Sequence, residues 1–301
     1  MTVGRCLPRL RCAPGIVCLI AAVPVSACVS SVDGSSQEPL PQPVELTKRT
    51  ARAELCAGRT EIGAWQPDKD GVAHVDIDTS HCGLTGDPLY FTSLGGDASH
   101  WAARGVTSIY RSSSSGFRVV VLRSRAPELA DSAAWHVNWM ARSPDVQSPG
   151  LCTGRTSPAA FKQYEDGGVS VSVDLRHCDF EEAPVVLTSL GGVEGHAATR
   201  GATSLYGVSA DRFTVFIQKP GITTAQAEAW GWHVNWSASP PNNDSGEYCT
   251  GKSTLANTVW KQYGKSGLST RLTTTGCQAP LVFATLSGDR SHWYTTGASS
   301  I

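Results

Sequence analysis

The sequence repeats itself with a period of about 100 residues. The block Leu-Cys-Ala-Gly-Arg-Thr that starts at Leu55 returns with few changes at Leu151 and again at Tyr248. A repeat of this length is typical of a domain that folds independently, because solenoid units are much shorter. Each position can therefore be compared two or three times within one chain.

Other landmarks keep the same spacing and define the modules. Thr-Ser-Leu-Gly-Gly occurs at Thr92 and Thr188, and Trp-His-Val-Asn-Trp occurs at Trp135 and Trp232. The third copy stops at Ile301, before the part of the module that would contain the Trp-His-Val-Asn-Trp strand. The sequence predicts two complete modules and a truncated third, which we expect to pack poorly over 248–301 unless a partner completes it. The predicted boundaries are 51–145, 146–242 and 243–301.

The first 27 residues predict a signal peptide. Three arginines precede an apolar run, Gly15–Ala22, that is too short to span a bilayer. Small residues then lead to Cys28, in a pattern that resembles a bacterial lipobox whose cysteine would be acylated. Plain secretory cleavage after Ala27 and an organelle transit peptide are the alternatives. Residues 28–50, rich in Ser, Pro and Gln, predict a flexible tether.

The cysteines after the leader come as one widely spaced pair per module. A disulfide over such a loop contributes roughly 3 kcal/mol by the chain-entropy estimate. Zinc is the alternative, but zinc sites usually need clustered Cys-x-x-Cys or histidine at ligand spacing. The spacing favours structural disulfides in an oxidising compartment, so we expect an extracellular or cell-surface location. The predicted pairs are Cys56–Cys82, Cys152–Cys178 and Cys249–Cys277.

Charge argues against two classes of partner. Without the leader, 22 basic residues stand against 26 acidic ones, and no basic stripe occurs. Nucleic acids and anionic membrane surfaces are therefore not expected as partners. A membrane would be reached only through a lipid anchor at Cys28.

The hydrophobic pattern predicts an all-β fold. Residues 169–175 alternate strictly between apolar and polar types, whereas 185–190 are nearly continuously apolar or β-branched, as in an inner strand. Only 126–134 and 223–230 have helical propensity. The prediction is a tandem array of antiparallel β-sandwich modules, each with about six strands and one disulfide.

The order of these features resembles the H-type lectin domain of the snail agglutinins. It runs from an opening Cys-x-Gly through an aromatic residue (Trp65, Phe161 or Trp260) and a Pro-x-Val-x-Leu-type strand at Pro184. A Gly-Phe-Arg-Val strand at Gly116 and a terminal Trp-x-x-x-Trp strand follow. The resemblance implies six-stranded sandwiches that bind N-acetylgalactosamine-type sugars and associate as trimers.

This chain departs from that family at the sugar site. The family places a Trp-His pair just after the Gly-Phe strand, where this chain has 122–126 and 218–221. No sugar-binding residue can therefore be transferred by matching.

The strongest candidate site is the loop after Gly-Gly. A carboxylate, an imidazole and an indole on one loop suit a saccharide, since the ring stacks on the pyranose and the polar groups bind hydroxyls. If Trp101 were a core residue, its replacement by Ala197 in the next copy would leave a cavity costing roughly 3–5 kcal/mol. We therefore expect a partly exposed position. The competing interpretation is a Trp over the sheet edge, with the His capping a turn. The candidate residues are Asp97, His100, Trp101, Arg104, Glu194, His196, Arg200, Asp289, His292 and Trp293.

Two other sets are weaker candidates. His136 and His233 lie opposite the tryptophans of the last strand and are interpreted as satisfied by backbone, with a groove or protomer contact as the alternative. Asp76 and Asp78 resemble an acid/base pair, but only Asp174 recurs in the second copy, so a solvated strand face is favoured.

These observations predict an exported, multivalent, lectin-like surface protein that binds glycans or glycoconjugates and has no catalytic activity. No catalytic triad, phosphate loop or metal spacing is found, and no cofactor or metal is expected. The alternatives are an adhesive surface protein that binds protein or matrix, and a secreted glycan-acting enzyme. Homo-oligomers are a further expectation.

Overall fold

The computed structural model describes residues 55–68, 71–144, 150–165, 167–241, 248–254, 256–273 and 281–301. The predicted signal peptide, the tether and Cys28 lie outside the described residues. Residues Thr50–Ile301 form one compact unit. Within it we refer to repeat 1 (55–144), repeat 2 (151–241) and repeat 3 (248–301). No helix in the described ranges is long and apolar enough to cross a membrane.

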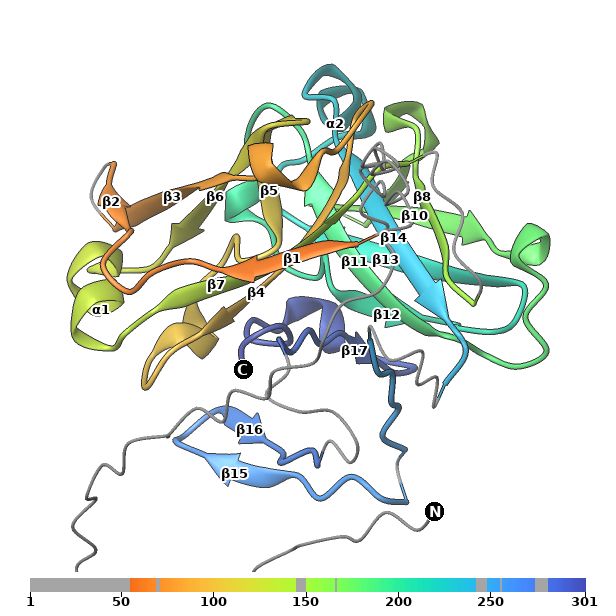
Figure 1. Cartoon of the computed structure of the whole chain (residues 1–301). Coiled ribbons are helices and arrows are strands. Elements are labelled where there is room, and N and C mark those ends of the chain that lie inside the picture. Colours follow the sequence, from red (N-terminus) through yellow and green to blue (C-terminus); the bar gives the residue numbers. More distant parts are fainter. Residues whose placement is uncertain are drawn as a thin grey trace, which may run out of the picture. The chain divides into compact units, whose positions relative to one another are not determined.

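Repeat 1 is the predicted antiparallel sandwich, shown in orange to yellow-green in Figure 1. One sheet has the order β1-β7-β4, and the facing strands have the order β2-β3-β6-β5. The bounds are β1 Cys56–Arg59, β2 Gln66–Pro67, β3 Val72–Asp78, β4 Leu89–Gly95, β5 Ser108–Ser113, β6 Gly116–Leu122 and β7 His136–Arg142. The predicted helical stretch forms α1, Ala126–Ser132.

Repeat 2 has the same architecture. Its sheets have the orders β8-β14-β11 and β9-β10-β13-β12. The bounds are β8 Cys152–Arg155, β9 Lys162–Tyr164, β10 Gly168–Asp174, β11 Val185–Gly191, β12 Ser204–Tyr206, β13 Arg212–Gln218 and β14 His233–Ser239, with α2 at Thr224–Ala229. The all-β prediction is confirmed in both repeats.

The core of each complete repeat is built from the alternating strands and the tryptophans. Along β6, Phe117, Val119 and Val121 are buried, while the residues between them are half-buried. Trp135 is fully buried and accepts, through its carbonyl oxygen, the indole N–H of Trp65 at 2.9 Å. Large aromatic side chains contribute the most apolar area to such a core, and here two of them also satisfy a buried polar group.

Two of the three predicted disulfides lie within the described residues. Cys56–Cys82 joins β1 to the turn after β3, and Cys152–Cys178 does the same in repeat 2. Cys249 is also disulfide-bonded, but its predicted partner Cys277 lies outside the described residues. Disulfides form and persist in oxidising compartments, which agrees with the expected location.

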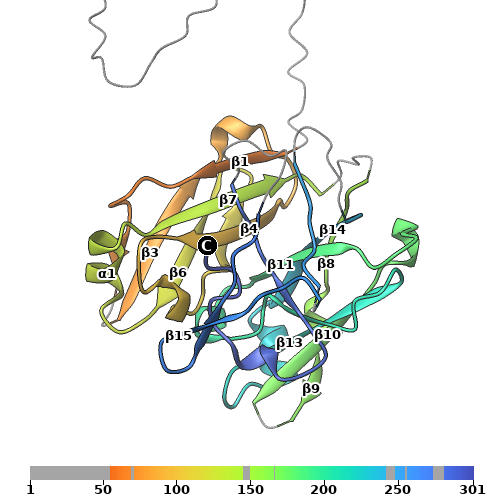
Figure 2. The same cartoon turned by 90° about the horizontal axis from the view of Figure 1, so that it is seen from below.

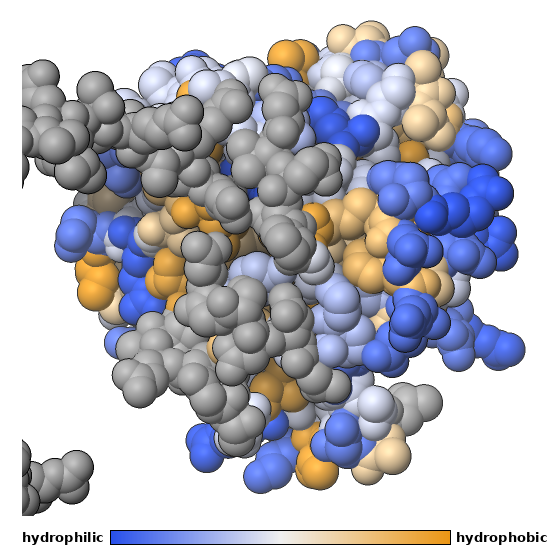
Figure 3. Space-filling view, turned by 45° about the vertical axis from the view of Figure 1, so that its right-hand side comes forward, coloured by the Kyte–Doolittle hydropathy of each residue, from blue (hydrophilic) through white to orange (hydrophobic). Residues whose placement is uncertain are grey.

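Repeat 3 contributes short strands only. They are β15 Lys261–Tyr263, β16 Gly267–Ser269 and β17 Leu286–Ser287. Its first part exposes large apolar side chains: Trp260 is 46% and Leu268 62% exposed, whereas the equivalent Trp65 is buried. Figure 3 shows one face of the molecule, where apolar side chains lie in separate groups among hydrophilic ones.

Residues 281–301 of repeat 3 are, in contrast, packed in part, with His292, Trp293 and Ser299 buried. The expectation that the whole of 248–301 packs poorly is wrong for these three residues, because repeats 1 and 2 supply their neighbours. The amide of Ile301 donates to the Leu94 carbonyl of β4 at 2.9 Å. The C-terminal segment accordingly lies beside repeat 1 in Figure 2.

The three repeats close a ring through equivalent parallel strand contacts. β5 pairs with β11, β12 pairs with β17, and Ser300 forms a parallel bridge to Leu94 in β4. We call the contacts seam 1/2, seam 2/3 and seam 3/1. Each seam also has one hydroxyl that donates to a carbonyl of the preceding repeat: Ser189 to Tyr90, Thr285 to Val186 and Ser93 to Val282.

Candidate functional site

The predicted His-Trp loops lie at the seams of the ring. Each loop forms a single 3-10 turn a few residues after the end of β4, β11 or β17. The turns are His100–Ala102, His196–Ala198 and His292–Tyr294, and a residue with left-handed backbone precedes each one. That residue, Ser99, Gly195 or Ser291, redirects the chain so that the histidine faces the neighbouring repeat.

At seam 1/2 the histidine is a buried contact between repeats. His196 Nε2 lies 2.9 Å from the Ile109 carbonyl oxygen, and its ring stacks on Tyr110 with 3.6 Å between centroids. The Tyr110 hydroxyl accepts the amide of Ala197 at 2.8 Å, and the Ser108 hydroxyl donates to the His196 carbonyl at 2.9 Å. Four groups of this turn, namely the His196 ring, Nε2 and carbonyl and the Ala197 amide, are thus engaged by repeat 1.

Seam 2/3 repeats this arrangement. His292 Nε2 lies 3.0 Å from the Leu205 carbonyl oxygen, and its ring stacks on Tyr206 at 3.9 Å. The Tyr206 hydroxyl accepts the amide of Trp293 at 2.9 Å. At seam 3/1, the Ser300 hydroxyl donates to the His100 carbonyl at 3.4 Å. The three histidines therefore hold equivalent places around the ring.

Burial favours the neutral form of His196 and His100. Desolvation lowers the pKa of His196 to about 4, against the opposing effect of the Ile109 and Glu194 carbonyls. Desolvation also lowers the pKa of His100, where the Ala98 and Ile301 backbone oxygens oppose it. A neutral imidazole donates only one hydrogen bond. In His196 that bond is best made by Nε2–H to the Ile109 carbonyl, 2.9 Å away, since Nδ1 is farther, 3.3 Å, from the Glu194 carbonyl.

The tryptophans of these loops pack against a tyrosine of the preceding repeat. Trp293 meets Tyr164 with ring centroids 5.3 Å apart, and Trp101 meets Tyr263 at 5.7 Å, both edge to face. Trp293 also lies over Gly168, where an added Cβ would come within 2.7 Å of the indole.

Seam 1/2 replaces this whole set. Asp68 and Val72 stand in repeat 1 where repeat 2 has Tyr164 and Gly168, and Ala197 stands where repeat 3 has Trp293. The strand pairing confirms the equivalence, because Tyr164 pairs with Gly168 and the amide of Asp68 donates to the carbonyl of Val72. Repeat 1 thus has a valine side chain at the position where repeat 2 has the glycine that the indole covers.

The expected exposure of the tryptophan position holds for Trp101 only. Trp101 is 36% exposed, whereas Trp293 is 7% and Ala197 is 4% exposed. The carboxylates Asp97, Glu194 and Asp289 are exposed on the same loops, and His196 and His292 are buried. The loop thus divides into a buried imidazole and, at seam 3/1, an exposed indole beside an exposed tyrosine.

The two candidate arginines line a pocket where the three repeats meet, and Arg104 also donates to the Ala198 carbonyl of the His196–Ala198 turn at 3.4 Å. Arg104 and Arg200 line it together with the segments 103–108, 199–203 and 295–299. Their backbones are equivalent: Arg104 pairs with Leu122 in both directions, and Arg200 pairs with Gln218. We call this site the central pocket.

The histidines of the last strand have neighbouring backbone partners, as interpreted from the sequence. His136 Nδ1 lies 3.2 Å from the Ala134 carbonyl, and His233 Nδ1 lies 2.8 Å from that of Gly231. Each ring covers the glycine that ends the inner strand, Gly95 or Gly191, where an added Cβ would fall within 2.3 Å or 2.1 Å of Nε2.

The asparagines next to them are buried against the seams. Asn138 accepts from Arg59 at 2.8 Å and donates to Ser93 at 3.3 Å; Asn235 does the same with Arg155 and Ser189. Ser93 and Ser189 are the seam hydroxyls. These contacts lie within one repeat each, and the alternative of a groove or protomer contact stays a prediction.

The aspartate pair lies on an exposed strand face. Asp76 accepts two hydrogen bonds of 2.6 Å from Arg118, which lowers the pKa of its carboxyl. Asp78 accepts the Ser80 amide at 2.8 Å. Each carboxylate is thus engaged separately, which agrees with a solvated face.

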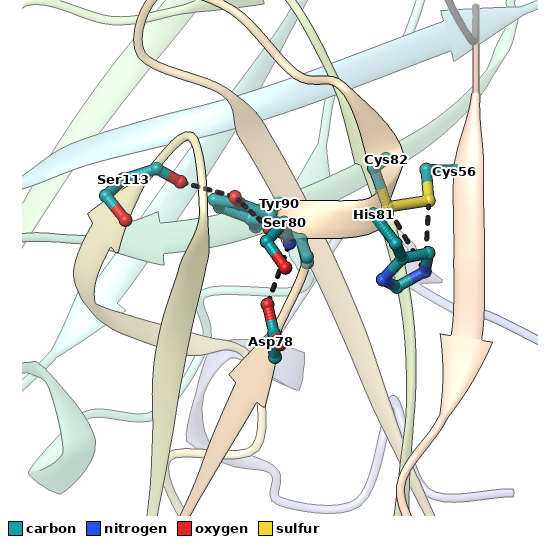
Figure 4. The surroundings of a disulfide bond; sticks show 8 residues. Cys56, Asp78, Ser80, His81, Cys82, Tyr90 and Ser113 are labelled. Carbon is teal, nitrogen blue, oxygen red and sulfur yellow. Dashed lines mark hydrogen bonds between the residues drawn. A yellow bond between two sulfur atoms is a disulfide. The ribbon is translucent and has the colours of Figure 1, made fainter.

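A histidine lies beside each described disulfide, and Figure 4 shows His81 beside Cys56–Cys82. His81 Nε2 lies 3.6 Å from the sulfur of Cys82 and 3.9 Å from that of Cys56, and His177 repeats this at Cys152–Cys178. These sets have the donor types of a metal site. A sulfur in a disulfide is not a thiolate ligand, so each oxidised set offers a metal only its imidazole.

Sequence reasoning found the histidines and tryptophans but missed their tyrosine partners. Tyr110 and Tyr206 recur at the same place, and Tyr164 and Tyr263 precede the turn into the next strand. One sequence signal could have found Tyr164. Repeat 1 lacks the Tyr and Gly that repeat 2 has at Tyr164 and Gly168, and repeat 2 lacks the Trp that repeat 3 has at Trp293, so the three positions change together.

Comparison with protein-family models, curated proteins and solved structures found no match. The resemblance to H-type lectins therefore stays a prediction that rests on the sequence pattern.

Proposed function

We propose that this chain is an exported, multivalent, lectin-like protein that binds glycans and has no catalytic activity. The observation that carries the proposal is the set of exposed aromatic side chains at seams 3/1 and 2/3. At seam 3/1, Trp101 and Tyr263 are 36% and 49% exposed, and their rings touch. At seam 2/3, Tyr164 and Tyr294 are 36% and 45% exposed on either side of Trp293.

These clusters have the chemistry that a pyranose needs. An aromatic face covers the apolar side of a sugar ring, and nearby carboxylates accept hydrogen bonds from its hydroxyls. Asp97 and Asp289 are exposed on the loops that carry Trp101 and Trp293. Because Trp101 and Tyr164 each contact a ring across a seam, and Tyr294 contacts Trp293, binding would order few additional side chains, which lowers the entropic cost.

The ring arrangement supports multivalent binding. Two aromatic clusters on one rigid unit can raise avidity by roughly 10²–10⁴ over a single weak site. A ring of three repeats also parallels the trimers that the H-type lectin resemblance implies. The disulfides support export, and acylation at Cys28 would hold the protein at a cell surface.

The test is binding of the mature chain, residues 28–301, to a glycan array. The variant Trp101→Ala/Tyr294→Ala removes an exposed ring from each cluster without removing the buried Trp293. We expect binding to at least one glycan class and a loss of about tenfold or more in the double variant. Trp260→Ala, which removes an exposed ring outside both clusters, is the matched control and should bind like the parent.

Three outcomes would overturn the proposal. Equal binding by parent and double variant would remove the aromatic clusters as the site. Absence of glycan binding together with saturable binding to matrix proteins would favour the adhesive alternative. Release of sugars from the array would make the protein an enzyme. Circular dichroism of each variant shows that the fold is retained.

A further inference from the structure

We infer that the central pocket is a binding site for a small oxyanion, namely a carboxylate or sulfate group. If the anion is a substituent of an acidic glycan, the inference rests on the proposed function. If the anion is a free ion, the inference is independent of that function. The pocket is lined by equivalent segments of all three repeats, so the ring itself creates it. None of the repeats forms it alone.

The charge of the pocket points to an anion. Arg104 and Arg200 line it, and its remaining lining residues include no Asp, Glu, Lys or His. Among the described residues, the ion pairs with carboxylates are Arg118–Asp76, Arg155–Asp87 and Arg176–Asp174, so neither pocket arginine takes part in one. The Arg104 guanidinium donates a hydrogen bond to the Ala198 carbonyl of repeat 2 at 3.4 Å. In a chain with a net charge of −1, two arginines that line one pocket without a carboxylate partner are a local feature.

The backbone fixes where the two arginines start. Arg104 exchanges hydrogen bonds of 3.1 and 3.0 Å with Leu122, and Arg200 exchanges two of 3.0 Å with Gln218. Each arginine precedes a glycine in left-handed conformation, Gly105 or Gly201, that turns the chain along the pocket wall. Both side chains thus leave equivalent points of the ring, with Thr296 at the corresponding point of repeat 3.

The chemistry and size of the pocket restrict its ligand. Guanidinium groups bind carboxylate and sulfate oxygens through charge-assisted hydrogen bonds, which are stronger than neutral ones. The free volume is about 40 Å³, which holds a few waters or one small charged group but not a sugar ring. The pocket would therefore take a charged substituent and leave the rest of a glycan outside.

The experiment is calorimetric titration of the mature chain with sodium sulfate, sodium glucuronate and glucose at constant ionic strength. We expect saturable binding of sulfate and glucuronate and none of glucose. Arg104→Gln/Arg200→Gln should weaken binding by at least about tenfold. Thr296→Arg, which adds a third guanidinium, should tighten it several-fold. Arg212→Gln, a matched change at an exposed arginine outside the pocket, should leave affinity unchanged.

Undiminished binding in the double variant would overturn the inference, as would an equal loss in Arg212→Gln. If the double variant does not fold, a Thr296→Arg chain that binds no more tightly than the parent would overturn it. Sulfate binding without glycan binding on the array supports the pocket and removes the proposed function. Glycan binding without sulfate or glucuronate binding supports the proposed function and overturns the inference about the central pocket.

Discussion

At the scale of single residues, the seam histidines link stability to pH. His196 is fully buried and neutral, and its pKa of about 4 in the folded state compares with 6.5 for an unperturbed histidine. Between these values the unfolded chain binds a proton that the folded chain does not. Stability from this residue is therefore complete above pH 6.5 and falls as the pH drops towards 4. Desolvation lowers the pKa values of His100, His74 and His233 in the same direction.

We predict that the free energy of unfolding decreases by up to roughly 3 kcal/mol from His196 alone between pH 6.5 and 4. His196→Gln, whose amide can still donate to Ile109, should make the decrease shallower. His81→Gln, at an exposed histidine, is the control and should leave the slope unchanged. Urea denaturation across this pH range measures both; identical slopes in parent and His196→Gln would contradict the prediction.

At the scale of elements, the same glycine turn brings each repeat against the next. Gly105, Gly201 and Gly297 have φ of 85°, 84° and 83°. A Cβ there would meet a backbone oxygen of the neighbouring repeat, at 3.0 Å from Ala197, 2.9 Å from Trp293 and 2.5 Å from Trp101 respectively. In repeats 1 and 2 it would also meet an oxygen of the same repeat, at 2.2 Å from Val120 and 2.3 Å from Phe216. Only glycine satisfies both the conformation and the close approach, which explains why the Gly survives where the residues around it vary.

We predict that Gly201→Ala destabilises the protein by about 2 kcal/mol or more, since strain from positive φ adds to the clash with Phe216. Gly251→Ala, where a Cβ meets nothing within 4 Å, should change stability by less than about 0.5 kcal/mol. Thermal unfolding of the two variants compares them directly. Similar midpoints for both would mean that the seam backbone relaxes freely.

At the scale of the whole molecule, the ring explains why seams 1/2 and 2/3 carry different side chains at three equivalent positions. Seam 2/3 packs Trp293 on Tyr164 over Gly168, whereas seam 1/2 has Ala197, Asp68 and Val72. The three positions belong to two repeats, so their joint change is a property of the seam. The seams therefore have one of two side-chain sets, either Trp, Tyr and Gly or Ala, Asp and Val.

We predict that Ala197→Trp alone destabilises the ring by roughly 1–3 kcal/mol, because the indole has no space beside Val72. Adding Val72→Gly and Asp68→Tyr should recover most of this loss by recreating the set of seam 2/3. Chemical denaturation of the single and triple variants gives the coupling between the repeats. A triple variant no more stable than Ala197→Trp would show that the two seams differ in geometry.

Much of the fold follows from the sequence by itself. The alternation along 169–175, the Gly-Gly turns and the cysteine spacing determined the strands, the all-β class and the described disulfides, because these depend on contacts within one module. The backbone partners of His136 and His233 followed in the same way, since those carbonyls lie two residues away.

Only the tertiary structure decided what the His-Trp loops face. His196 and Ile109, or Trp293 and Tyr164, are brought together by the closing of a ring, and such contacts join positions far apart in the chain whose pairing no local pattern encodes. The same closure packs part of residues 281–301 and forms the central pocket around Arg104 and Arg200. The sequence determined the module, and the burial of its edges against the next copy determined the sites.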